Sequence, residues 1–160
     1  EPWKYSINQL GYNYRLTDIQ SALGISQLKK LNSFIKRRNE IAQIYNAKLK
    51  KLDLFEIPKV RKKILHAYHL YPLKIRFDKL KINKDMLLKK LRSKGINLQV
   101  HYIPIHHHKL YRLKVKSYLP NAENFFKQAI SLPVYFSLKN SEISHVLKKL
   151  LEIVYSNLKK

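Results

Sequence analysis

The chain of 160 residues has no cysteine, only three glycines, and only ten acidic residues against 33 basic ones. The absence of cysteine excludes disulfide frameworks, zinc–thiolate sites and thiol catalysis, and it fits a reducing compartment. The glycines, Gly11, Gly24 and Gly95, stand far apart, so no glycine-rich loop is available to cradle a phosphate. No apolar run approaches the roughly 18 residues of a membrane span, and no signal peptide is visible. We therefore expect a cytoplasmic protein without a membrane partner.

The excess of basic residues gives a formal net charge of +23 at pH 7. A charge of this size is a known footprint of nucleic-acid binding. Here, however, the lysines and arginines are spread along the whole chain and fall mostly on the polar sides of expected helices, which is typical of a solvated surface. We expect no nucleic-acid partner, and a positive field of this kind would instead concentrate small anionic ligands.

Apolar periodicity predicts a folded α+β domain, with a small, mostly antiparallel sheet and helices packed on one side of it. Helices are expected over 17–31, 33–52, 84–94 and 121–131 and from Ser141 onward, and strands over 66–77 and 96–102. Short extended pieces are expected at 55–58 and 132–134. Asn83 is a predicted N-cap and Gly95 a predicted helix end. Pro72 cannot donate to a ladder, so an edge or a bulge is expected there.

The most informative segment covers residues 11–22, where a polar turn leads directly into an amphipathic helix. Asn13 offers an amide that donates and accepts, and Arg15 offers a planar fork of five donors. Thr17 with Gln20 is the pattern of a capping box at the helix start. Two structural alternatives remain open, in which Asn13 satisfies its own turn and Arg15 pairs with Asp18.

This segment resembles the pattern G-x-N-x-R-[LM]-[ST]-[DE]-[IL]-Q-[AS]-A of the DegT/DnrJ/EryC1/StrS family of sugar-nucleotide aminotransferases. Further blocks resemble the family in the same order, at 27–31, 36–42, 69–72, 99–104, 121–123 and 131–133. The chain is most similar to the subgroup that aminates a UDP-linked 4-keto sugar on the way to pseudaminic acid.

The resemblance implies an enzyme of aminotransferase fold type I that depends on pyridoxal 5′-phosphate (PLP) and transfers an amino group, typically from L-glutamate, to a keto-deoxysugar. It also implies a homodimer whose active sites are shared across subunits. The family's Schiff-base lysine lies upstream in a Ser-x-His-x-x-Lys context, which this chain does not contain. We therefore expect a C-terminal portion without catalytic residues and inactive alone, with 1–31 ending the large domain and 32–160 forming the small domain, including a long linking helix. The alternatives are a degenerate, non-catalytic small domain and a basic nucleic-acid-binding module.

The same resemblance places Asn13 on the PLP phosphate of the partner subunit, with Arg15 as a second cofactor contact. It implies that Tyr14, His101, Tyr102 and His106 approach the nucleotide sugar. For His69 we favour a side chain that faces the core. The run 106–108 has the appearance of a metal site, but consecutive side chains usually diverge and no acidic residue lies close in sequence, so we expect no metal there.

Overall fold

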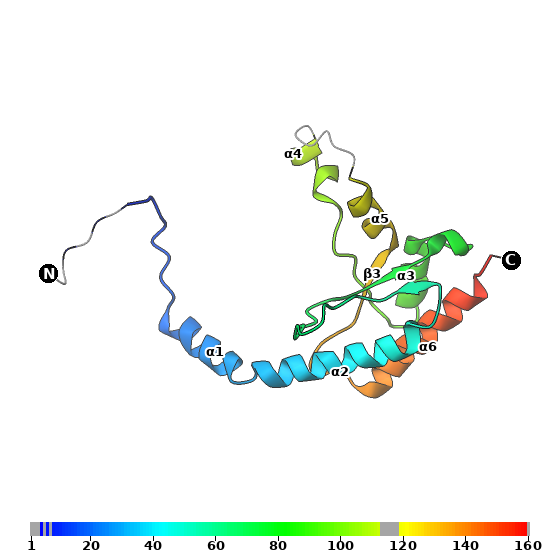
Figure 1. The fold of residues 1–160 in the computed structure, drawn as a ribbon, viewed down its shortest axis with the longest axis horizontal. Helices are drawn as coiled ribbons and strands as arrows, with labels where there is room; N and C mark the ends of the chain where they lie inside the picture. The colour runs from blue at the N-terminus through cyan, green and yellow to red at the C-terminus, as the bar shows by residue number, and fades with distance from the viewer. Residues whose placement is uncertain (1–3, 5, 7, 113–118, 160) are drawn as a thin grey trace. The chain divides into compact units, whose positions relative to one another are not determined.

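The computed structural model describes residues 4, 6, 8–112 and 119–159. The chain divides into two compact units, 1–32 and 33–160. In the first unit, α1 (Asp18–Leu28) follows a segment without regular structure (Figure 1). The expected capping box is confirmed: the Gln20 amide N–H donates to Thr17 Oγ1 at 3.3 Å, and the Thr17 N–H donates to Gln20 Oε1 at 2.9 Å. The helix break falls at Lys29 and Lys30, earlier than expected, because α2 (Leu31–Leu49) already begins at Leu31.

The second unit contains a three-stranded antiparallel sheet, which confirms the α+β expectation. Its order is β1 (Phe55–Glu56), β2 (Tyr71–Ile75) and β3 (Ala129–Leu132) (Figure 1). Tyr71 pairs with Leu132, and Lys74 pairs with both Ala129 and Glu56. Pro72 lies beyond the end of the β1 ladder, so β2 is locally an edge where the proline lacks its N–H donor.

Several of the expected elements are wrong in extent. The expected strand 96–102 is reduced to a single bridge between Gln99 and Ser131. The expected helix 121–131 ends at Gln128, and the next four residues form β3. All four residues of β3 are buried. A short run that is buried on both faces shows no periodic alternation by which a strand could be told from the end of a helix.

The remaining helices complete the second unit. They are η1 (Phe77–Lys79), α3 (Lys84–Arg92), η2 (Ile105–His107), α4 (Lys109–Arg112), α5 (Pro120–Gln128) and α6 (Asn140–Ser156). Asn83 caps α3 as expected, because its Oδ1 accepts from the Met86 N–H at 2.9 Å. Among the described residues, none of these helices or of α1 and α2 is long and apolar enough to cross a lipid bilayer.

The core of the second unit lies between one face of the sheet and the helices. Tyr71, Leu73 and Ile75 alternate with less buried residues along β2 and are fully buried. The ring of Tyr45, from α2, packs 5.0 Å from the ring of Tyr71. Further fully buried side chains come from α2, α3 and α6: Ile41, Leu49, Leu87, Leu91, Ile143, Leu150 and Val154. Arg37 of α2 donates to the Leu138 carbonyl and the Asn140 side chain, and so joins α2 to the start of α6.

Gly95 ends α3 in the left-handed region, with φ of +77°. Its N–H donates to the Arg92 carbonyl at 3.0 Å. We expect Gly95→Ala to lower the free energy of unfolding by about 1–2 kcal/mol, because a Cβ is disfavoured at this φ. Gly95→Asn should cost less, since asparagine tolerates this region better. No atom of the described residues lies within 4 Å of an added Cβ, so the cost is conformational. Urea unfolding midpoints test this, and an alanine variant as stable as the parent would contradict it.

Candidate functional site

Asn13, Tyr14 and Arg15 line an open hollow in the first unit, together with Leu16 and Gln20. All of these side chains are exposed, and the rings of Tyr12 and Tyr14 stack with centroids 5.1 Å apart. Among the described residues, neither Asn13 nor Arg15 has a hydrogen-bond or ion-pair partner, and Arg15 does not pair with Asp18. Two polar side chains rich in donors are therefore available to an anion at the start of α1.

The first unit also exposes an extensive apolar surface. No residue of α1 is buried within the unit. The large exposed hydrophobic side chains in and before this helix are Leu10, Tyr12, Tyr14, Leu16, Ile19, Leu23, Ile25 and Leu28. A group of this size is typical of a surface that another surface covers.

A second hollow, of about 360 Å³, lies within the second unit and gathers polar side chains from four separate segments. Arg38 comes from α2, His69 precedes β2, His101 follows the Gln99 bridge, and Ser131 belongs to β3. His101 Nδ1 lies 2.8 Å from Ser131 Oγ, which fixes the orientation of the imidazole. Arg38 donates to the Tyr68 carbonyl at 3.3 Å. The arrangement presents one cation and several hydrogen-bonding groups to an occupant.

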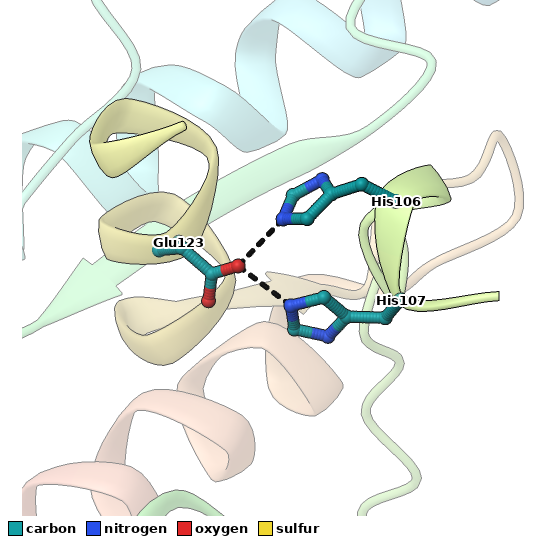
Figure 2. Close-up of side chains that lie close together, drawn as sticks. All are labelled: His106, His107 and Glu123. Atoms are coloured by element: carbon teal, nitrogen blue, oxygen red, sulfur yellow. Dashed lines mark hydrogen bonds and ion pairs between the residues drawn. The ribbon is translucent and has the colours of Figure 1, made fainter. Parts of the chain in front are cut away.

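His106 and His107 converge on Glu123, at the first turn of α5 (Figure 2). Each Nε2 lies 2.6 Å from Glu123 Oε1. Hydrogen bonds from His106 and His107 hold the pKa of the Glu123 carboxyl below its usual value, and the bond from His106 has the larger effect. The expected divergence of this run is therefore wrong for its first two members, because they lie in the tight turn η2 and because Glu123, 17 and 16 residues away, folds back onto them.

Residues 2–151 match the model of the DegT/DnrJ/EryC1/StrS aminotransferase family. The chain belongs to this family. An uncharacterized protein of Methanocaldococcus jannaschii, MJ1066, is 41% identical over 158 residues, which cover 97% of this chain and 41% of that protein. The UDP-4-amino-4,6-dideoxy-N-acetyl-beta-L-altrosamine transaminase of Campylobacter jejuni serotype O:2 is 35% identical over 153 residues, covering 95% of this chain and 40% of that enzyme.

Among solved structures, the aminotransferase PseC of Helicobacter pylori, involved in the biosynthesis of pseudaminic acid, superposes with a TM-score of 0.83 at 32% identity. The alignment covers 98% of this chain and 42% of that one. The chain thus spans about 40% of the length of the relatives that it matches.

The family blocks that are scattered along the sequence meet at the second hollow. Arg38, His69, Gln99, His101 and Ser131 belong to four of these blocks, and all of them line it. Sequence reasoning missed Arg38, Gln99 and Ser131 as site residues, although their membership in the blocks was the available signal. No local pattern shows that the blocks converge.

One sequence-based expectation, that for His69, changes at this hollow. His69 is exposed and lines it, whereas we expected a side chain facing the core. Tyr68 takes the buried place instead, with φ of +43° and its ring 6.2 Å from that of Tyr71. Tyr102 follows a cis peptide bond after His101, is 75% exposed and lies outside the lining. The alternation of buried and less buried side chains that we expected over 66–77 begins only at Tyr71. The residues before Tyr71 therefore do not alternate between the two faces of the strand.

Proposed function

We propose that this chain is the C-terminal part of a PLP-dependent aminotransferase acting on nucleotide sugars. The full-length enzyme would move an amino group from L-glutamate to a nucleotide-linked keto-deoxysugar, with a UDP-linked 4-keto sugar favoured, in the synthesis of a surface polysaccharide or glycan. The match of residues 2–151 to the aminotransferase family carries the proposal. The similarity to a UDP-amino-sugar transaminase and to PseC supports the choice of substrate class.

The hollow of the first unit has side chains that fit the phosphate of PLP. Asn13 supplies an amide donor and Arg15 a charged fork, and both are exposed without partners among the described residues. Charge-assisted hydrogen bonds of this kind are the strong ones for phosphate. When bound, PLP supplies the electron sink for amino transfer. In this proposal Asn13 holds the phosphate of the partner subunit's cofactor, and Arg15 neutralises part of its charge.

The hollow of the second unit fits the polar part of a nucleotide sugar. Arg38 offers a guanidinium for a diphosphate oxygen, and His101, oriented by Ser131, offers its Nε2 to a hydroxyl or phosphate oxygen. Tyr14 and Tyr102 are exposed and remain proposed contacts of the sugar nucleotide. His106 has Nε2 committed to Glu123, so a substrate contact would use its Nδ1.

We propose a homodimer with active sites shared between subunits, working in the cytoplasm. The apolar surface in and before α1 supports a covered position for this segment, against the rest of the longer protein and the partner subunit. The absence of cysteine is consistent with a reducing compartment.

The test is an assay of the full-length protein with PLP, L-glutamate and a UDP-linked 4-keto-6-deoxysugar. We expect 2-oxoglutarate and an aminated nucleotide sugar, identified by its mass, in equal amounts. A full-length protein that lacks an upstream Ser-x-His-x-x-Lys motif and binds no PLP would contradict the proposal. It would support the non-catalytic small domain instead.

His101 gives a sharper test of the second hollow. His101→Phe removes the imidazole nitrogens and keeps an aromatic ring, and we expect it to raise KM for the nucleotide sugar by about 10-fold or more, the cost of a hydrogen bond to a charged group. Retention of PLP should be unchanged. The control is His108→Phe, a substitution of an exposed histidine outside this hollow. An unchanged KM in the His101 variant would remove His101 from the substrate site.

A further inference from the structure

We propose that His106, His107 and Glu123 form a binding site for a divalent transition-metal ion, with Zn²⁺ as the best-fitting ion. The inference does not depend on the aminotransferase proposal, because all three residues lie in the second unit, outside both hollows described above. Each offers one ligand atom, and these atoms lie within 4.8 Å of one another. Figure 2 shows both imidazoles directed at the same carboxylate.

The local backbone explains why two consecutive histidines point the same way. η2 is a 3-10 turn, closed by hydrogen bonds from the His107 N–H to the Pro104 carbonyl and from the His108 N–H to the Ile105 carbonyl. The two rings are 4.6 Å apart at 82° to each other. The ring of His107 also packs edge-on against Phe126, with centroids 6.0 Å apart. These contacts hold the imidazoles in place before any ion arrives, which limits the cost of ordering them.

The glutamate is equally well placed. It lies one turn before Phe126 on α5, and Lys84 of α3 holds that part of α5 through the Phe126 carbonyl. The side chains are partly shielded, with exposed fractions of 15% for His106, 21% for Glu123 and 39% for His107. The site is therefore partly shielded but still accessible to solvent.

The donor set is one that zinc prefers. Two imidazole nitrogens and one carboxylate oxygen make a three-ligand zinc site whose fourth position is left for water or another oxygen ligand. Ligand atoms about 2.0–2.2 Å from a tetrahedral ion lie roughly 3.3 Å apart. The present separation of 2.6 Å from each Nε2 to Oε1 must open by less than about 1 Å. Small rotations of these partly shielded side chains achieve this and bring the two Nε2 atoms, which lie within 4.8 Å of each other, to the same spacing.

Metal binding also has a simple proton balance. In the metal-free state each Nε2–H donates to the carboxylate. Coordination requires the lone pair of each Nε2, so each ring proton moves to Nδ1, which has no hydrogen-bond partner among the described residues. The two hydrogen bonds are replaced by two Zn–N bonds and one Zn–O bond.

The experiment uses the full-length protein with its cofactor bound and without any histidine tag. Zn²⁺ is titrated in competition with a chromophoric chelator, and Co²⁺ is used as a spectroscopic probe of tetrahedral geometry. We expect one Zn²⁺ per chain and a Co²⁺ complex with visible absorption. His106→Ala and His107→Ala should each weaken Zn²⁺ binding by at least 10-fold.

Two further variants separate a metal site from a hydrogen-bonded contact. Glu123→Gln keeps an oxygen that accepts from both histidines but removes the charge, so the fold should remain while Zn²⁺ binding weakens by at least 10-fold. His108→Ala changes the third histidine of the run, which lies outside the cluster, and should leave binding unchanged. An absence of stoichiometric Zn²⁺, or equal losses in the His107 and His108 variants, would overturn the proposal.

Discussion

Replacing Asn13 by aspartate in the full-length protein is expected to lower the affinity for PLP by about 100-fold or more. If Asn13 donates to the phosphate as proposed, the change removes that donor, worth roughly 1.5–3 kcal/mol for a charged acceptor, and adds a like charge beside the phosphate. Asn13→Ala, which removes only the donor, should have the smaller effect. The measurement is the absorbance of bound PLP after gel filtration at graded cofactor concentrations.

Asn8→Asp is the matched control, since it places the same charge on another exposed residue of the segment. A hybrid dimer then tests whether the site is shared. One subunit carries Asn13→Asp and the other lacks the proposed upstream Schiff-base lysine, so at a PLP concentration too low to load the Asn13→Asp site neither homodimer is active. After subunit exchange in an equal mixture, half of the dimers are hybrids and one of the two sites in each hybrid is intact, so we expect about a quarter of the parent activity. Mixtures that stay inactive would place Asn13 in its own subunit's site or outside the site.

Raising the pH above about 10 is expected to destabilise the second unit through two buried tyrosines. Burial raises the pKa of Tyr45 and of Tyr71 well above the usual value of 10.0, and neighbouring phenols add to the effect. The Tyr45 hydroxyl donates to the Pro133 carbonyl at 3.0 Å, and the Tyr71 hydroxyl donates to Asn46 Oδ1 at 2.6 Å. Both protonated phenols are therefore held as donors within the fold.

The direction follows from proton linkage. Above pH 10 the unfolded chain loses two phenolic protons that the folded unit retains, so stability is fully present below this pH and falls as the pH rises. Each tyrosine contributes a slope of up to about 1.4 kcal/mol per pH unit. Urea midpoints between pH 9 and 11.5 measure the slope, and the phenolate absorbance of Tyr45 and Tyr71 should appear only together with unfolding.

Tyr45→Phe separates the two contributions. It removes one titrating group at a neutral-pH cost of about 1 kcal/mol for the lost hydrogen bond, and it should reduce the alkaline slope by about half. Tyr155→Phe, a change of an exposed tyrosine on α6, should leave the slope as it is. An alkaline slope that is equal in the parent and in Tyr45→Phe would show that Tyr45 does not stay protonated in the fold.

The features that could be predicted from the sequence are those fixed by neighbouring residues. The Thr17 cap, the Asn83 cap and the helix end at Gly95 each depend on residues within one turn, and all three appear as expected. The strands were harder to place, because β1 has two residues and β3 is buried on both faces. Their position depends on pairing with β2, which no local period encodes.

The candidate sites divide in the same way. Asn13 and Arg15 lie together in the sequence and together at one hollow. The pair His101–Ser131 is separated by 30 residues, and Glu123 by 16 from the nearer histidine. Such contacts depend on how β3 and α5 fold back, so residue spacing alone predicted a divergent histidine run and a core-facing His69.

The exposed apolar surface in and before α1 has a consequence for biogenesis. A newly made chain displays these side chains until a covering surface becomes available, and during that interval it can associate with any other apolar surface. The interval shortens as subunit concentration rises if a second copy supplies the cover. In that case the yield of assembled protein depends on the rate of pairing relative to the rate of aggregation, and chaperones that shield apolar segments favour pairing.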